Sequence, residues 1–472
     1  MSPDAMVSHF VGASALVLVA AHAAGWLARK LKQPYIVGQL TAGIALGPSL
    51  LGAVAPRAYE TLFPPSIGPA LTGFAQFALV VFLFAVGYEL DLKILGARAR
   101  TSVTVALTAF VVPMGVGSGC ALLFGERLRA LGMPRHLSPA MIVFVGVALS
   151  ITAVPVLTAI VRENGLARTV PGVVAVSAAG LLDVIGWTVL AGTLLENGHH
   201  QVLGWPVRLT IAVLFVTAML LVARPALRLL LWRTRMEPSL RLALLIGFAL
   251  GSAWLTHAIG LHVIFGALLA GSVVPREEGG RLDPDLLRPL HGVSSLLLPF
   301  FFVVSGQSVA LNSMDSTGWV ALLVVTALAV VTKIGSGTAA ARFGGLDRQD
   351  AWTVGILLSA RGLTELIALN AGLQAGLLST PLYTVLVFMA LATTLFTQPL
   401  LLLAGRSGRQ RRRTDRYAGD GGAALAGVPS PAGEKDPWLP TGGGPGPVPR
   451  APAPESPVPE APVPEAPVPE AG

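Results

Sequence analysis

The sequence contains little charge and one cysteine. Lys, Arg, Asp and Glu make up 12% of its 472 residues, whereas hydrophobic residues make up 53%. A typical globular chain is about 25% charged, so this chain has too little charge to cover a surface in water. Soluble enzymes, soluble nucleic-acid binders and secreted disulfide scaffolds are therefore excluded. The single cysteine, Cys120, rules out an intramolecular disulfide and a multi-cysteine metal site. No cofactor is expected, and the composition indicates a multi-pass membrane protein.

The net charge of +8 does not require a nucleic-acid partner. Residues 405–472 hold eight basic and eight acidic residues, so the whole excess lies in residues 1–404. There it is concentrated in short loops between apolar stretches. The positive-inside rule explains such an excess, because loops on the cytoplasmic side of a membrane are enriched in Lys and Arg.

Apolar stretches divide residues 1–404 into candidate membrane spans. A helix needs about 20 residues to cross a hydrocarbon core of about 30 Å. This length predicts thirteen transmembrane helices, at 8–28, 35–54, 67–89, 101–124, 138–161, 170–195, 205–223, 239–257, 259–275, 290–311, 317–341, 351–377 and 380–404. Residues 1–404 are thus expected to form a membrane domain that carries the function of the protein.

The charge of the loops tests the number of spans and predicts which side of the membrane each loop faces. One set of alternate loops carries 24 Lys and Arg residues and the opposite set carries five. The split predicts an external N-terminus and a cytoplasmic C-terminus. No Lys or Arg precedes Arg29, so the first span is expected to be retained rather than cleaved as a signal peptide. Residues 405–472, with 15 prolines and three copies of PVPEA, are expected to form a disordered cytoplasmic tail.

Two spans share a short repeat. Residues 38–43 and 266–271 both read G-x-L-x-A-G, 228 residues and seven predicted helices apart. A looser match follows between residues 82–92 and 300–311. An odd number of helices reverses the direction of crossing, so the pattern predicts an inverted repeat. Secondary transporters use this architecture and bind substrate near the membrane midplane, where broken helices meet.

The same offset pairs the spans 138–161 and 351–377, which are both predicted to be broken. Pro155 cannot donate to the carbonyl of Ile151, and Ser150 and Thr152 supply hydroxyls beside the break. In the second span, Gly362 directly follows the charged residue Arg361 and weakens the helix at that point.

Four ionisable residues fall inside the predicted spans: Asp183, Lys333, Arg361 and Glu365. Charges at this depth are costly to insert and mark ion or proton paths. A buried aspartate can hold either a proton or a monovalent cation, which is the chemistry of antiport; the alternative is a carboxylate that pairs with a base. Lys333 either pairs with a carboxylate in the cation-free state or extends to an interface. Arg361 and Glu365, spaced i,i+4, form either a fixed pair at the break or a mobile ligand.

Several motifs together resemble the Kef-type bacterial cation/proton antiporters and the plant cation/proton exchangers. They are QPYIVG at residues 33–38, GIALGPSLLG at 43–52, GYELD at 87–91, SITAVPVL at 150–157, FFVVSG at 301–306 and RGLTELIALN at 361–370. The resemblance implies a sodium/proton antiporter fold with a dimer domain and a mobile core domain, assembled as a homodimer in the cell membrane. It also implies that Asp183 is the essential carboxylate, that Lys333 is the matching lysine and that the two broken helices cross.

One position departs from the family pattern. Many members carry an acidic pair, Asn-Asp or Gln-Asp where this chain has Leu182-Asp183. Leu182 cannot pair with Lys333, so the lysine either pairs with Asp183 or is largely neutral. The resulting hypothesis is a transporter that exchanges Na⁺ or K⁺ for H⁺ by alternating access. The alternative is an organic-solute transporter or an uncoupled cation leak on the same fold.

Overall fold

The computed structural model describes residues 2–404 apart from residue 32, residues 90–97, residue 135 and residues 198–204, 234–236, 259–261 and 277–281. Within these ranges every regular element is a helix, which confirms the all-helical prediction. The segment 405–472, expected to be a tail, lies outside the described residues.

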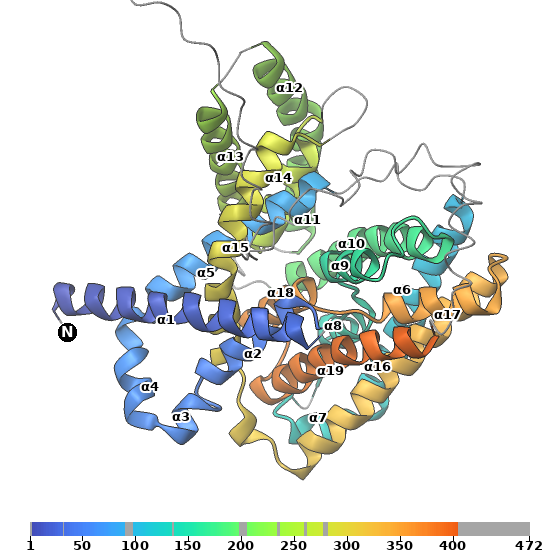
Figure 1. Cartoon of the computed structure of the whole chain (residues 1–472), viewed down its shortest axis with the longest axis horizontal. Coiled ribbons are helices and arrows are strands. Elements are labelled where there is room, and N and C mark those ends of the chain that lie inside the picture. The colour runs from blue at the N-terminus through green and yellow to red at the C-terminus, as the bar shows by residue number, and fades with distance from the viewer. Residues whose placement is uncertain are drawn as a thin grey trace, which may run out of the picture.

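The helices form two bundles whose members pack mainly with one another (Figure 1). The first, called the scaffold bundle, comprises α1 (Pro3–Lys30), α2 (Tyr35–Leu46), α5 (Gly68–Glu89), α11 (Trp205–Ala218), α12 (Arg224–Arg233), α13 (Pro238–Ala258), α14 (Val263–Val273) and α15 (Pro284–Gln307). The second, called the core bundle, comprises α6 (Ala99–Leu123), α8 (Pro139–Ser150), α9 (Val154–Glu163), α10 (Val170–Asn197), α16 (Ser316–Phe343), α17 (Arg348–Leu358), α18 (Leu363–Gln374) and α19 (Thr380–Ala404). Short helices α3 (Leu51–Val54), α4 (Pro56–Leu62) and α7 (Gly125–Ala130) lie in the connections.

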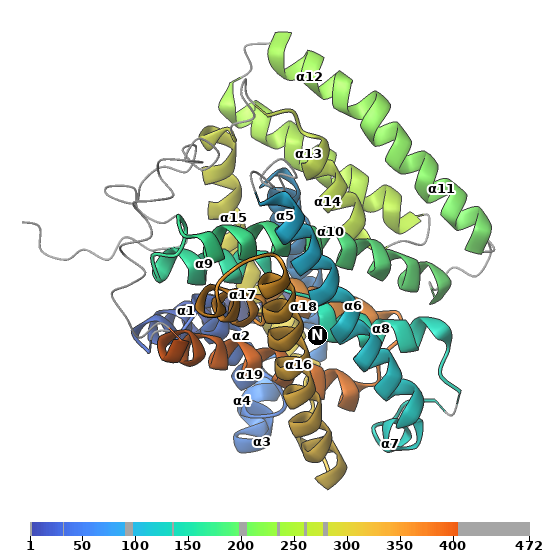
Figure 2. The same cartoon turned by 90° about the vertical axis from the view of Figure 1, so that its right-hand side faces the viewer.

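Among the described residues, eleven helices are long and apolar enough to cross a membrane, or twelve if the bent pair α17 and α18 is one span. The chain is therefore a multi-pass membrane protein. The remaining predicted span, 259–275, contains α14, whose eleven described residues are too few to cross alone. The predicted span 205–223 is longer in the structure, because a π-helical turn at Met219–Ala223 joins α11 to α12. Figure 2 shows these two helices as one rod along the outer edge.

Close backbone approach builds the centre of the scaffold bundle. A Cβ atom at Gly43 of α2 would lie 2.2 Å from the carbonyl oxygen of Phe302 in α15. A Cβ atom at Gly271 of α14 would lie 2.0 Å from the carbonyl oxygen of Phe84 in α5. Because only glycine lacks this atom, both positions allow helices to touch backbone to backbone.

Two spans of the core bundle are interrupted at matching places. Between α8 and α9 the chain is non-helical at Ile151–Ala153, and Pro155 lies in the first turn of α9, where its missing N–H costs nothing. Between α17 and α18 the chain is non-helical at 359–362, and the two helices bend by 41°. Pro113 and Pro299, by contrast, lie within continuous helices.

Candidate functional site

The two breaks contact each other. The backbone N–H of Ala153 donates to the carbonyl oxygen of Ala360 at 3.2 Å, and the hydroxyl of Thr152 donates to the carbonyl oxygen of Leu358 at 3.0 Å. Each break therefore satisfies backbone groups that the other leaves unpaired, as a membrane interior requires. The arrangement brings together two helix C-termini with partial negative charge and two helix N-termini with partial positive charge.

Lys333 caps the C-terminus of α8. Its Nζ atom donates to the carbonyl oxygens of Ser150 and, at 3.0 Å, of Ala109 in α6. The side chain is fully buried. These are backbone partners, and no ion pair between Lys333 and Asp183 is present among the described residues. The lysine ammonium is thus positioned to balance a helix C-terminus as well as a carboxylate.

Arg361 caps the same helix end. Its guanidinium donates to the carbonyl oxygens of Ala148 at 2.6 Å and Leu149 at 2.5 Å. Together with Ser150, three consecutive carbonyls at the end of α8 receive hydrogen bonds from two cationic side chains. Hydrogen bonds to charged donors are the stronger class, so the end of α8 is firmly held.

Arg361 also pairs with Glu365. The guanidinium NH1 atom donates to Oε1 of the carboxylate at 2.6 Å, and both side chains are at most 1% exposed. Glu365 lies in the first turn of α18, where a negative charge complements the helix N-terminus. Its second oxygen, Oε2, is buried and has no hydrogen-bond partner among the described residues. Arg361 and Glu365 thus form a buried ion pair beside the second break.

Asp183 lies on α10, which packs against α8, α9 and α17. Its side chain is 3% exposed, and its Oδ2 atom has no hydrogen-bond partner among the described residues. A buried carboxylate oxygen without a protein donor is costly, and a proton or a bound cation removes the cost. The preceding residue, Leu182, is also buried and offers no second carboxylate.

The two hydroxyls predicted beside the first break are buried there. Ser150 donates its hydroxyl to the carbonyl oxygens of Phe110 at 3.0 Å and Gly146 at 2.8 Å. Thr152 donates to the second broken helix, as described above. With their hydrogens committed to carbonyls, both oxygens keep lone pairs that can accept a hydrogen bond or coordinate a cation.

Thr394 of α19 is a residue of this region that the sequence did not single out. Its hydroxyl accepts from the backbone N–H of Arg361 at 3.1 Å and donates to the carbonyl oxygen of the same residue at 2.7 Å. One side chain therefore satisfies both backbone groups of the residue in the middle of the break. Buried threonines in an apolar span are the signal that could have identified it.

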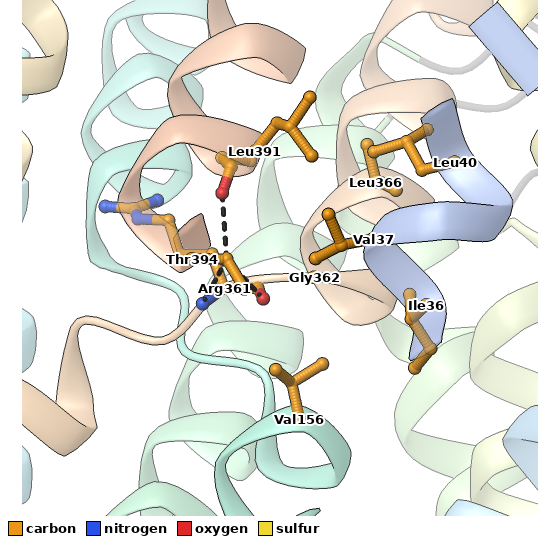
Figure 3. A pocket seen from close by; sticks show the side chains of 10 residues that line it. Ile36, Val37, Leu40, Val156, Arg361, Gly362, Leu366, Leu391 and Thr394 are labelled. Atoms are coloured by element: carbon orange, nitrogen blue, oxygen red, sulfur yellow. Dashed lines mark hydrogen bonds between the residues drawn. The ribbon is translucent and has the colours of Figure 1, made fainter. Parts of the chain in front are cut away.

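A small cavity adjoins the second break (Figure 3). Ile36, Val37 and Leu40 of α2 face it from the scaffold bundle. The residues that line it from the core bundle are Val156, Arg361, Gly362, Leu366, Ala390, Leu391 and Thr394. The cavity is therefore a gap between the two bundles, and its walls are mostly apolar.

Gly362 sets the width of the second break. A Cβ atom at this position would lie 2.6 Å from Cγ2 of Val156 at the start of α9. Glycine thus allows the N-termini of α9 and α18 to approach each other. Since both N-termini favour negative charge, they form an electrostatically positive region between the breaks.

Comparison with solved structures supports the fold. The sodium proton antiporter MjNhaP1 from Methanocaldococcus jannaschii superposes with a TM-score of 0.62 at 15% sequence identity, over 88% of this chain and 100% of that chain. At this identity the likeness concerns the fold alone.

Curated relatives share more of the sequence. The Na⁺/H⁺ antiporter NhaS4 of Synechocystis is 32% identical over 385 residues, which cover 80% of this chain and 92% of the relative. The K⁺/H⁺ antiporter 1 of Saccharomyces cerevisiae is 31% identical over 79% of this chain and 44% of its own length. The cation/H⁺ antiporter 17 of Arabidopsis thaliana is 32% identical over 85% of this chain and 49% of its own length. The chain thus spans about half the length of the yeast and plant relatives.

The family model for the transmembrane sodium/hydrogen exchangers matches residues 17–403, which include both broken spans as well as Asp183, Lys333, Arg361 and Glu365. Together with the relatives above, this match shows that the chain belongs to the sodium/hydrogen exchanger family.

Proposed function

We propose that this protein exchanges a monovalent cation, Na⁺ or K⁺, for H⁺ across the cell membrane. The observation that carries the proposal is the carboxylate of Asp183, which is buried on α10, a helix that packs against α8, α9 and α17, with one oxygen lacking a protein donor. Because burial disfavours a bare charge, the group is stabilised by a proton or by a cation. The two ligands compete for one site, and this competition couples their movements.

The relatives support this choice of substrates. NhaS4 is named for Na⁺ and H⁺, and the yeast relative for K⁺ and H⁺. Ser150 and Thr152 supply hard oxygen atoms next to the first break, and a hard monovalent cation prefers oxygen ligands. In this scheme Asp183, Ser150 and Thr152 bind the cation, whereas Lys333, Arg361 and Glu365 balance the charges of the helix ends.

Alternating access is supported by the repeated contacts of α2 and α14. Gly38 approaches the carbonyl of Ala24 in α1, and Gly266 approaches the carbonyl of Ser252 in α13. The two glycines are 228 residues apart, and so are the two residues that they approach. In the same way, Gly43 of α2 approaches Phe302 of α15, and Gly271 of α14 approaches Phe84 of α5. Helices α15 and α5 therefore take corresponding places beside the two repeated helices. These reciprocal contacts support an inverted repeat. The distribution of Lys and Arg among the loops supports thirteen spans with an external N-terminus and a cytoplasmic C-terminus.

We infer that the protein forms a homodimer and that the scaffold bundle provides the interface between the two copies. Many large apolar side chains of α11, α12 and the π-helical turn between them are exposed, among them Leu214 of α11 and Leu221 and Val222 of the turn. In a membrane such a surface contacts lipid or a second copy of the chain. A scaffold held still by dimerisation leaves the core bundle free to move.

Proton-driven cation flux in proteoliposomes tests the proposal. We expect Asp183→Asn to abolish Na⁺- and K⁺-dependent proton movement, because the amide can neither bind a proton nor carry the charge that attracts a cation. Asp315→Asn is the matched control, since Asp315 caps α16 and asparagine caps equally well. Exchange at the normal rate in Asp183→Asn refutes the assignment.

Currents on solid-supported membranes separate this proposal from its alternatives. Concentration jumps of Na⁺, K⁺ and Li⁺ should produce responses that depend on the pH gradient. A cation response that does not depend on pH indicates an uncoupled leak. A lack of response to all three cations supports the organic-solute transporter, which the missing acid at Leu182 would permit.

A further inference from the structure

Polar side chains bridge the two bundles at the end of α18 that is remote from the break. His262 is the N-cap of α14, and its Nδ1 atom accepts from the backbone N–H of Ile264 at 3.5 Å. The hydrogen of the neutral ring is then on Nε2, which lies 3.4 Å from Oε1 of Gln374 and donates to it. This bond joins α14 of the scaffold bundle to α18 of the core bundle.

The chain of hydrogen bonds continues along α18 and returns to the scaffold bundle. Gln374 donates from Nε2 to Oδ1 of Asn370 at 3.0 Å, and Asn370 donates from Nδ2 to the hydroxyl of Ser305 in α15 at 3.3 Å. Asn370 is 7% exposed and Ser305 is 1% exposed. Three head-to-tail hydrogen bonds thus join four side chains from three helices, and they fix the orientation of both amides.

Two bonds from α19 reinforce the same end. The hydroxyl of Tyr383 donates to the carbonyl oxygen of Ser305 at 3.2 Å. The backbone N–H of Ala310 donates to the hydroxyl of Thr384 at 3.1 Å. Both bonds run between the core bundle and the end of α15, so a displacement of the core bundle along α15 stretches them together with the amide chain.

The contact between the bundles at the cavity is of another kind. There Ile36, Val37 and Leu40 of α2 face mostly apolar side chains of the core bundle. Dispersion contacts have little directionality, so one apolar surface can slide over another at small cost. Hydrogen bonds depend steeply on distance and angle and break when the surfaces shift. The polar end therefore resists movement more than the apolar end does.

We propose that His262, Gln374, Asn370 and Ser305 form a latch that holds the two bundles together on the outer side of the membrane, and that opening this latch exposes the cation site to the outside. The proposal rests on the orientation and the exchange activity proposed above. Helix α18 links the two regions mechanically, because it begins at the break with Leu363 and ends at the latch with Gln374.

A variant that removes the bond between α14 and α18 tests the idea. Gln374→Leu cannot accept from His262 or donate to Asn370. The matched control is Gln398→Leu, because Gln398 makes a comparable amide pair with Asn164, at 3.0 and 3.1 Å, but entirely within the core bundle. The outward-open state should become more populated in Gln374→Leu alone, since only that variant loses a bond between the bundles, the one from His262.

The readout is the concentration of Na⁺, and separately of K⁺, that gives half-maximal exchange on each face, measured in right-side-out and inside-out membrane vesicles. Loss of one neutral hydrogen bond shifts a two-state equilibrium about fivefold, so we expect the outer value to fall by about that factor relative to the inner value. Equal ratios in Gln374→Leu and Gln398→Leu, or a fall on the inner face, overturn the proposal.

A double-mutant cycle isolates the bond between α14 and α18. If His262 acts through Gln374, then His262→Ala combined with Gln374→Leu should change the ratio no more than Gln374→Leu alone. Additive effects show that the two side chains act independently and contradict the latch.

Crosslinking tests the latch without depending on its energy. In a Cys120→Ser background, His262→Cys with Gln374→Cys joined by a bismaleimide should stop exchange, whereas N-ethylmaleimide on the same pair should not. Exchange that continues after bismaleimide joins the two cysteines overturns the proposal. If the uncrosslinked wild type exchanges no cation, the failure lies in the proposed function and not in the latch.

Discussion

Lys333 donates a hydrogen bond from Nζ to the carbonyl oxygen of Ala109 at 3.0 Å. This bond ties α16 to the middle of α6, and the second bond of the same ammonium reaches the last carbonyl of α8 at Ser150. The lysine therefore connects three helices of the core bundle around the first break. Two measurements address Lys333 separately: thermal stability reports on how it holds the first break, and the voltage dependence of exchange reports on the role that we propose for it in transport.

Lys333→Met should lower the thermal stability of the protein. The substitution leaves two buried carbonyls without a donor, at about 1–3 kcal/mol each. Thermal unfolding in detergent micelles measures the change, with Val331→Met, at a 68% exposed position of the same helix, as the control. An unfolding temperature equal to that of the control would show that the ammonium does not hold the helix end.

The voltage dependence of exchange is a separate test of Lys333. Lys333→Ala should retain some turnover but change its voltage dependence, because one buried positive charge has been removed from the core bundle, which we propose moves during exchange. Reversal potentials in proteoliposomes measure this. An unchanged reversal potential removes the lysine from the coupling scheme.

Removing Arg361 alone should lower the stability of the protein more than removing both Arg361 and Glu365. Arg361→Met leaves a buried carboxylate without its partner, and breaking a buried pair in this way costs about 3–5 kcal/mol. Arg361→Met combined with Glu365→Leu removes both charges and should be less destabilised. The unfolding temperatures of the single and the double variant decide the matter, and a double variant that is less stable than Arg361→Met contradicts the prediction.

Thr152→Val should raise the cation concentration needed for half-maximal exchange. Valine has nearly the same shape but lacks the oxygen, so both the bond to Leu358 and the candidate cation ligand are lost. Thr152→Ser retains the hydroxyl and should behave almost as the wild type. If the valine and serine variants show the same cation dependence, the hydroxyl of Thr152 is not a ligand.

Gly43→Ala should destabilise the scaffold bundle, since the added Cβ lies 2.2 Å from the Phe302 carbonyl oxygen. Gly251→Ala on α13 is the control, because no atom lies within 4 Å of the added group. There alanine should stabilise the helix by about 0.5–1 kcal/mol. Opposite shifts in unfolding temperature are expected, and a shift of the same sign in both variants would argue against the close approach of α2 and α15.

Hydropathy and loop charge were sufficient to predict an all-helical membrane domain, because the length and apolarity of a span are local properties of the chain. Pro155 and Gly362 marked the places where two spans are interrupted, since each residue acts on its own helix. Asp183, Lys333, Arg361 and Glu365 were found for the same reason. Each is a rare charge within an apolar stretch, and no knowledge of its neighbours is needed to see it.

Which groups these charges touch was decided by the tertiary structure. The sequence left Lys333 either paired with Asp183 or largely neutral, and it did not indicate that the side chain donates to the carbonyls of Ala109 and Ser150. Every residue has a carbonyl, so no sequence pattern marks the few that a helix break frees. The same holds for His262 and Gln374, which lie 112 residues apart and meet because the two bundles pack at that point. Long-range partners of this kind depend on packing, which the order of residues specifies only through the complete fold.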